Sequence, residues 1–424
     1  MLQVPEIRKN RDQFINRLAK RGIRDAGVIL DEVIELDERR KEIQAKLDGV
    51  LAEMNKTSKA IGLLMREGKK EEAEAAKSTT SEYKAESQTL STRLDEVKAE
   101  LQTALYNIPN VPNQIVPSGS TENDNECVFT VDSLPELPES AKPHWDLISD
   151  YDIVDFELGS KITGAGFPVY KGKGAKIQRA LINFFLDEAE AAGYEEVQPP
   201  IVINESSGLG TGQLPDKEGQ MYHISDSDLY LIPTAEVPIT NMYRDVILDE
   251  SQLPIQNVGY TPCFRREAGS WGAHVRGLNR LHQFDKVEIV QVQTPEKSYE
   301  ALDKMLAHVE GLLKKLELPY RILRLCGGDL GFTSALTYDF EVYAAGQKRW
   351  LEVSSVSNFE TYQANRLKLR YRTADNKKEL LHTLNGSALA IPRIVAAILE
   401  NGQSEEGINL PKALQKYLVF DKIS

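Results

Sequence analysis

The stretch that decides the fold reads CFRRE at residues 263–267 and, after a loop that contains glycine, RGLNRLHQFDKVE at residues 276–288. The two parts predict a β-hairpin. Phe284, Lys286 and Glu288 share one face of the second strand, because side chains alternate every two residues. By itself this pattern is also typical of a surface hairpin with salt bridges. Four arginines, two glutamates and an aromatic ring in so short a segment equally suit a pocket for an anion and a base.

Further strands are predicted around this hairpin, and a long amphipathic helix precedes it. The helix spans residues 175–193 and ends at a glycine, as helix C-termini favour. Several strands follow one another without an intervening helix, which favours an antiparallel sheet in an α+β domain of residues 111–424. The segments with strand character are residues 201–203, 229–232, 257–261, 283–293, 320–325, 338–343 and 349–355.

Residues 1–110 have a different character and are predicted to form a separate helical domain. No proline occurs between Pro5 and Pro109, and apolar residues recur at heptad spacing on both sides of a polar, glycine-centred interruption. Two helices of about 38 residues, each about 57 Å long, are expected to fold back as an antiparallel coiled-coil hairpin over about 28–105. A longer helical bundle and a coiled coil between two chains are the alternatives. The heptad positions are Leu36, Ile43, Leu47, Val50, Met54 and Ile61, then Leu90, Leu94, Val97, Leu101 and Leu105.

Composition narrows the class of protein. The chain has 424 residues, of which 41% are hydrophobic and 27% charged, as in globular proteins. Its apolar runs fall short of the roughly 20 residues needed to cross a bilayer, so no membrane partner is expected. Cys127, Cys263 and Cys326 have no paired spacing, which argues against disulfides and zinc and favours a reducing cytoplasm.

The net charge of −13, taken whole, argues against a nucleic-acid partner, but the charge is unevenly distributed. Residues 1–110 contain 20 basic and 20 acidic residues, so residues 111–424 hold the remaining 31 basic and 44 acidic ones. The N-terminal domain therefore leaves room for RNA binding through local basic clusters. Gly208, Gly210 and Gly212 do not have the spacing of a dinucleotide fingerprint and predict a mobile loop instead.

Five segments in order carry a resemblance to a known family. Residues 263–288 resemble motif 2 of the class II aminoacyl-tRNA synthetases, in the form found in the seryl-tRNA synthetases. Residues 172–199 resemble motif 1, which builds the dimer interface, and residues 385–393 resemble motif 3. Residues 234–236 and 352–355 match the serine and ATP–metal segments. The resemblance covers essentially the whole chain, and it implies a class II synthetase domain built on an antiparallel sheet flanked by helices.

The resemblance implies a role for each matching residue of the ATP site. Arg265 would hold the α-phosphate and Arg276 and Arg393 the β- and γ-phosphates, for which the always-charged arginine fork is suited. Glu267 would bind the adenine amino group, and Phe284 would stack on its ring. Arg265 and Arg393 would be the catalytic residues. Glu352 and Ser355 would hold Mg²⁺ with the ATP. Without the resemblance, the local sequence around Glu352 is typical of an ordinary charge that faces outward from a strand. The implied ATP-binding set is Arg265, Glu267, Arg276, Leu281, Phe284, Glu352, Val353, Ser354, Ser355 and Arg393.

The implied L-serine site combines carboxylates and hydroxyls. A carboxylate suits the substrate ammonium group, and a second one can accept from its hydroxyl. Taken alone, Ser387 is typical of a helix N-cap before Ala388. The set is Thr234, Ala235, Glu236, Glu288 and Ser387.

The implied function is that of a serine–tRNA ligase, which activates L-serine with ATP and transfers it to tRNA(Ser), and to tRNA(Sec) where present. A homodimer, Mg²⁺ and no zinc follow from the same resemblance. A synthetase-derived regulatory protein and an amino acid:carrier-protein ligase are the alternatives; intact phosphate arginines argue against the first, and the hairpin with no Cys/His cluster against the second. Trp271, Ala273 and His274 stand in the motif 2 loop where more charge is expected. The basic residues expected at the arm tip, for tRNA, are Lys56, Lys59, Arg66, Lys69 and Lys70.

Overall fold

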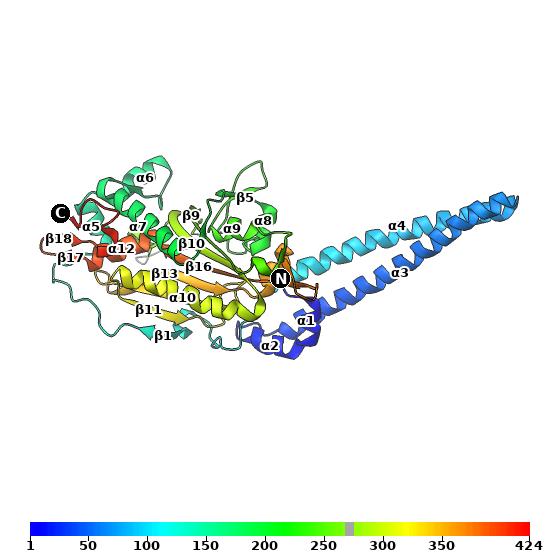
Figure 1. The fold of residues 1–424 in the computed structure, drawn as a ribbon, viewed down its shortest axis with the longest axis horizontal. Helices are drawn as coiled ribbons and strands as arrows, with labels where there is room; N and C mark the ends of the chain where they lie inside the picture. The colour runs from blue at the N-terminus through cyan, green and yellow to red at the C-terminus, as the bar shows by residue number, and fades with distance from the viewer. Residues whose placement is uncertain (268–274) are drawn as a thin grey trace. The chain divides into compact units, whose positions relative to one another are not determined.

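The computed structural model describes residues 1–267 and 275–424. The motif 2 loop with Trp271, Ala273 and His274 lies outside the described residues. In the part that is described, no helix is long and apolar enough to cross a membrane. The chain divides into two compact units (Figure 1), the first of residues 1–19 and 23–109 and the second of residues 20–22 and 110–424.

The first unit is a long helical hairpin with two short helices at its base. Helices α3 (Ala26–Arg66) and α4 (Lys70–Asn107) run side by side in Figure 1, joined by a turn in which Gly68 has a φ of +76°. Glycine suits this turn because a positive φ is strained for residues with a Cβ. The hairpin within one chain is therefore confirmed. The short helices are α1 (Val4–Lys9) and α2 (Arg11–Ala19), and the buried heptad positions are Leu36, Leu47, Leu94, Val97, Leu101 and Leu105.

A buried carboxylate ties α1 to α3. Asp37 accepts hydrogen bonds from Arg8 (3.0 Å) and Arg40 (2.7 Å), and its carboxylate lies 2.8 Å from the Lys41 ammonium group. Burial disfavours the charged carboxylate, but hydrogen bonds from the three cations outweigh it and lower the pKa of Asp37 to about 2. Asp37 therefore holds the base of the hairpin in its ionised form at neutral pH.

The second unit is built on an eight-stranded sheet with the order β1-β11-β12-β13-β16-β10-β9-β4. Every neighbouring pair is antiparallel except β4 and β9, so the predicted sheet type is confirmed. The predicted strand at 283–293 coincides with β10, and the other predicted segments fall within a residue or a few of observed strands. The strands of this sheet are β1 (Glu126–Thr130), β4 (Glu195–Glu196), β9 (Ile255–Phe264), β10 (Gln283–Gln293), β11 (Tyr320–Arg324), β12 (Leu336–Ala344), β13 (Arg349–Asn358) and β16 (His382–Ala390).

Three helices pack on one face of this sheet and enclose the main hydrophobic core. Side chains such as Phe184, Val309 and Ile394 project from them into the core and are essentially inaccessible to water. Burial of such apolar surface is the dominant stabilising contribution to the unit. The three helices are α7 (Gly172–Ala191), α10 (Ser298–Lys315) and α12 (Ile391–Asn401).

The opposite face of the central strand β10 is polar. Ile289 points into the main core, whereas Val290 packs with Ala235 at the start of helix α9 (Glu236–Asn241). Because side chains alternate along a strand, Lys286 and Glu288 lie on the same face as Val290. The buried charges of β10 therefore lie on the face away from the helical core.

The remaining elements are short and surround the sheet. The helices are α5 (His144–Asp150), α6 (Phe156–Ile162), α8 (Glu205–Thr211) and α11 (Thr361–Leu367), with the 3-10 turns η1 (Glu122–Asp124), η2 (Glu250–Gln252), η4 (Gly277–Asn279), η5 (Pro295–Lys297) and η6 (Lys412–Leu414). The strands are β2 (Val154–Asp155), β3 (Val169–Tyr170), β5 (Val202–Asn204), β6 (Tyr222–His223), β7 (Leu229–Leu231), β8 (Ile247–Asp249), β14 (Arg370–Arg372), β15 (Lys378–Leu380), β17 (Gln403–Ser404), β18 (Gly407–Asn409) and β19 (Lys422–Ile423).

Two local predictions were wrong. Ser387 is not a helix N-cap: it lies inside β16, and helix α12 begins only at Ile391. The small residues after Ser387 carry no period that separates a strand from a helix. The segment at Gly208 and Gly210 is not a loop but helix α8, which Asn204 caps by accepting a hydrogen bond from the Ser207 backbone.

Candidate active site

Six buried or half-buried polar side chains meet on the face of the sheet away from the main core, and we call them the carboxylate cluster. They come from four places in the chain: the start of α9, strand β10, strand β16 and helix α11. The sheet register brings Glu288 opposite Ser387, so the neighbouring strand lines the same space. The members of the cluster are Thr234, Glu236, Lys286, Glu288, Gln363 and Asn385.

Hydrogen bonds join the cluster into one chain. Lys286 forms an ion pair with Glu288 and donates a hydrogen bond to the Thr234 hydroxyl at 2.9 Å. Asn385 Nδ2 lies 3.0 Å from a carboxylate oxygen of both Glu236 and Glu288, and so bridges them. Gln363 Nε2 donates to the other oxygen of Glu236 at 2.7 Å. The polar groups are thereby fixed in orientation before any substrate arrives.

The two carboxylates of the cluster influence each other electrostatically. The Glu236 side chain is 6% exposed and Glu288 is completely buried. Burial, together with repulsion by Glu288, raises the pKa of Glu236 to about 7, although the hydrogen bond from Gln363 opposes the shift. Near neutral pH, Glu236 is therefore poised between its neutral and charged forms, and a cation placed beside it would favour the charged form.

Arg265 links the carboxylate cluster to the motif 2 hairpin. It follows β9 directly, its Nε donates to the Pro233 carbonyl at 3.3 Å, and its guanidinium lies 5.3 Å from the centre of the Phe284 ring. Pro233 immediately precedes Thr234, so the guanidinium lies next to the segment of residues 234–236. A cation and an aromatic face are therefore presented side by side, as an anion and a planar ring require.

Two more arginines stand on either side of the turn η4. Arg393 Nε donates to the Asn279 carbonyl at 3.0 Å, and its Nη1 donates to the Glu352 carbonyl at 2.6 Å. Arg276 is largely exposed and lies 5.0 Å over the Trp145 ring. The three arginines predicted to bind phosphates thus all belong to the second unit, two of them fixed by backbone carbonyls.

The other predicted ATP residues lie along β13 and the end of the hairpin. Ser354 is buried and donates to the Ser387 carbonyl at 2.6 Å, which joins β13 to β16. Glu267 forms an ion pair with Arg280 at 2.8 Å. Leu281 and Val353 are buried in the core. Val353 and Leu281 therefore support the site through packing.

An acidic pair on neighbouring strands fits a hard cation. Asp339 pairs with Ser355 across β12 and β13 and accepts a hydrogen bond from its hydroxyl at 2.5 Å, while the Glu352 carboxylate lies 3.4 Å from the same hydroxyl. Burial and then the charge of Glu352 raise the pKa of Asp339 well above its ordinary value. A divalent cation would relieve this repulsion, and the oxygen donors suit Mg²⁺. Within the described residues no three His, Cys, Asp or Glu side chains gather in a metal-binding group.

Sequence reasoning missed four residues of this site: Asp339, Lys286, Gln363 and Asn385. Lys286 was placed on the same strand face as Glu288 but given no role. Asn385 was part of the motif 3 segment. Asp339 and Gln363 come to the site from distant parts of the chain through strand pairing and helix packing, so no local sequence pattern indicates their role. The five basic residues expected at the arm tip are all exposed near the turn of the first unit: Lys56, Lys59, Arg66, Lys69 and Lys70.

Comparisons with known proteins agree with this geometry. The family described as tRNA synthetase class II core domain (G, H, P, S and T) matches residues 222–402, which contain the carboxylate cluster and all three arginines. The fold and the site therefore define a class II aminoacyl-tRNA synthetase. The family described as Seryl-tRNA synthetase N-terminal domain matches residues 1–112, the helical hairpin.

Individual relatives identify the family within this class. Serine–tRNA ligase of Salinibacter ruber is 49% identical over 100% of this chain and 99% of its own, and that of Alkaliphilus oremlandii is 47% identical over 99% and 98%. A crystal structure of seryl-tRNA synthetase from Pyrococcus horikoshii complexed with ATP matches with a TM-score of 0.92 at 34% identity, covering 100% of this chain and 99% of that one. The chain belongs to the seryl-tRNA synthetases.

Removal of the cation from the cluster should destabilise the second unit. Lys286→Met leaves the buried Glu288 carboxylate without its partner, so we expect the free energy of unfolding to fall by about 3 kcal/mol. Urea unfolding followed by tryptophan fluorescence measures this, because Trp145 and Trp350 lie in the second unit and the sequence of the first unit contains no tryptophan.

Two further variants control this experiment. Lys304→Met removes an exposed lysine that pairs with Glu300 on α10 and should leave the stability nearly unchanged. The double variant Lys286→Met/Glu288→Gln should regain much of the loss. If Lys286→Met were as stable as Lys304→Met, the ion pair would not be the stabilising contact described above.

Proposed function

We propose that this chain is a serine–tRNA ligase that activates L-serine with ATP and then esterifies tRNA(Ser) with it. The observation that carries the proposal is the carboxylate cluster, in which Glu236 and Glu288 face one space beside Arg265. This arrangement offers negative charge for an ammonium group and, next to it, the positive charge of Arg265 for a phosphate. The names of the full-length relatives support the same activity.

The cluster suits serine among the amino acids. In the proposal, Glu236 binds the substrate ammonium group, and Glu288 with Thr234 and Ser387 surrounds the side-chain hydroxyl. Buried polar groups that hydrogen-bond a hydroxyl reject an analogue without it, because they are left unpaired. Alanine should therefore be a poor substrate although it is smaller.

The ATP side of the site supplies charge and orientation. Arg265 holds the α-phosphate, Arg276 and Arg393 hold the β- and γ-phosphates, and Phe284 stacks on the adenine next to Glu267. Glu352 and Ser355, to which we add Asp339, would hold a Mg²⁺ ion. When bound, that ion neutralises phosphate charge.

The chemistry needs no nucleophile from the protein. A carboxylate oxygen of serine attacks the α-phosphorus, the bond to the bridging oxygen of the β-phosphate breaks, and pyrophosphate leaves. A terminal ribose hydroxyl of the tRNA then attacks the carbonyl carbon, loses its proton and displaces AMP. Positioning and stabilisation of charge by Arg265 and Arg393 are sufficient for both steps.

The proposed function also involves a tRNA, a second subunit and a reducing cytoplasm. The helical hairpin binds tRNA through the basic residues at its tip, by contact with the RNA backbone and shape. The enzyme acts as a homodimer, as the resemblance of residues 172–199 to motif 1 suggests, and it also charges tRNA(Sec) where that tRNA exists. Three free thiols suit a reducing cytoplasm.

Serine-dependent exchange of pyrophosphate into ATP tests the activation step. Arg265→Ala should lower the exchange rate by roughly 10²–10³-fold, because one preorganised charge on the α-phosphate is lost. Arg372→Ala, which removes an exposed arginine on β14, is the matched control and should keep the wild-type rate. Exchange that is independent of serine, or an unchanged rate in Arg265→Ala, would overturn the proposal.

Charging of tRNA tests the role of the hairpin tip in the full-length chain. Replacement of Lys56, Lys59, Arg66, Lys69 and Lys70 by alanine should lower kcat/KM for tRNA(Ser) at least tenfold, since several phosphate contacts are lost. Serine-dependent pyrophosphate exchange should not change.

The control removes five exposed basic residues of the first unit that lie farther from the turn, and it should charge tRNA better than the tip variant. Equal charging by the two variants would mean that the tip has no special role. The control residues are Arg24, Lys46, Lys84, Arg93 and Lys98.

A further inference from the structure

We propose that His144, at the start of helix α5, is a positioning residue for the phosphate-binding arginines Arg276 and Arg393. It does so by a hydrogen bond to the turn η4, as part of a buried hydrogen-bond network that ends at Glu400 of helix α12. The inference rests on the proposed ATP-binding role of the two arginines.

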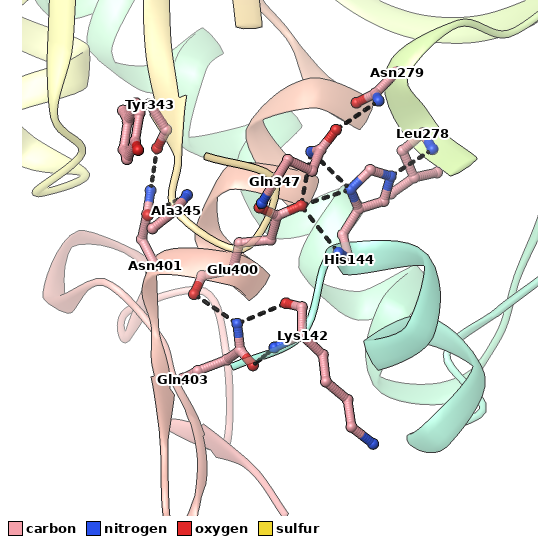
Figure 2. Close-up of polar contacts among 10 residues, drawn as sticks. All are labelled: Lys142, His144, Leu278, Asn279, Tyr343, Ala345, Gln347, Glu400, Asn401 and Gln403. Atoms are coloured by element: carbon pink, nitrogen blue, oxygen red, sulfur yellow. Dashed lines mark hydrogen bonds and ion pairs between the residues drawn. The ribbon is translucent and has the colours of Figure 1, made fainter. Parts of the chain in front are cut away.

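The network starts at the buried carboxylate of Glu400, which forms no ion pair with a lysine or arginine of this network. The side chains of Glu400 and His144 are both 0% exposed. Glu400 Oε1 accepts hydrogen bonds from the backbone N–H of His144 at 2.9 Å and from Gln347 Nε2 at 2.7 Å, and it lies 2.8 Å from His144 Nδ1 (Figure 2). Its Oε2 accepts from the Gln347 backbone at 2.9 Å. Four N–H groups thus surround this carboxylate.

The hydrogen bonds determine which nitrogen of His144 carries the proton. The Leu278 backbone N–H donates to Nε2 at 2.9 Å, so Nε2 is the acceptor. Nδ1 must then carry the hydrogen and donate it to Glu400. The imidazole is neutral in this arrangement. It connects the carboxylate of Glu400 to one backbone amide of η4, and a doubly protonated ring would lose that connection.

The turn η4 lies directly against the imidazole. Gly277 has a φ of +66°, and a Cβ added there would lie 2.4 Å from His144 Nε2. The position therefore requires glycine for both conformation and space. Asn279 Nδ2 donates to Gln347 Oε1 at 2.8 Å, which gives the turn a second anchor in the same network.

The position of the turn affects both arginines, Arg393 through a hydrogen bond and Arg276 through the chain. The Asn279 carbonyl accepts from Arg393 Nε at 3.0 Å, so a displaced turn moves the Arg393 guanidinium. Arg276 precedes the turn, and its guanidinium lies over the ring of Trp145, the residue after His144 on α5. Helix α5 thus contacts this segment at two points, Arg276 through Trp145 and Leu278 through His144.

Glu400 is itself anchored at the end of α12. Asn401 donates to the Tyr343 carbonyl at 2.7 Å and accepts from the Ala345 backbone at 3.2 Å. Gln403 donates to the Glu400 carbonyl at 2.9 Å and to the Lys142 carbonyl at 2.8 Å (Figure 2). The carboxylate therefore provides a rigid base from which the imidazole holds the turn.

Two substitutions of His144 separate its two hydrogen bonds. His144→Asn keeps a donor near the position of Nδ1 but removes the acceptor for Leu278, whereas His144→Gln keeps an acceptor near the position of Nε2. In serine-dependent pyrophosphate exchange, we expect His144→Asn to raise KM for ATP roughly tenfold with KM for serine changed less than twofold. His144→Gln should recover most of the ATP affinity.

Controls distinguish positioning from a general loss of structure. His382→Asn alters a buried histidine that hydrogen-bonds Ser298 on α10, and it should lower stability while leaving the ratio of the two KM values unchanged. If His144→Asn fails to fold, Gly277→Ala tests the same turn and should raise KM for ATP in the same selective way. Equal shifts of both KM values, or equal behaviour of His144→Asn and His144→Gln, would overturn the inference. Absence of serine-dependent exchange in the wild-type enzyme would instead overturn the proposed function.

Discussion

Glu236 and Glu288 share one buried cluster that contains a single cation, Lys286, which pairs with Glu288. Burial disfavours the charged form of Glu236, and the neighbouring Glu288 charge adds repulsion, so the pKa of Glu236 is raised to about 7. In the proposed function, the ammonium group of serine supplies the second positive charge beside Glu236. The bridging amides of Asn385 and Gln363 hold both carboxylates in place, so the site is ready before the substrate binds.

A further buried carboxylate, that of Glu400, is stabilised differently. Glu400 is surrounded by N–H donors and a neutral imidazole, so it needs no cation and remains a fixed anchor. In the proposed function, Glu236 changes its protonation state when serine binds, whereas Glu400 holds neighbouring backbone and side chains in place. The sheet places both on the same second unit: the carboxylate cluster stands on one face of β10, and α12 packs on the other. In the proposed function, recognition of the amino acid and orientation of the phosphates are thus carried out by two separate groups of residues in one unit.

Much of this fold could be predicted from the sequence, because local patterns carry it. The heptad spacing indicated the hairpin, and the alternation at 283–293 located β10 at its observed bounds. The N-cap prediction for Ser387 was wrong because small residues such as Ala388 fit a strand as well as a helix. Asp339 and Gln363 were not found at all, since strand pairing and the packing of α11 bring them to the site from distant parts of the chain. The network of His144 and Glu400 joins residues 256 positions apart, and no sequence window contains both.

The most direct test of the central claim is the binding of L-serine measured by calorimetry between pH 6 and 8. Because the serine ammonium favours the ionised form of Glu236, the dissociation constant should fall about tenfold as the pH rises through 7. At pH 7 binding should release roughly half a proton, seen as a dependence of the measured heat on the buffer. Glu236→Gln should bind serine more weakly and lose both effects. Serine affinity that does not change with pH, or an equal pH dependence in Glu236→Gln, would contradict the account.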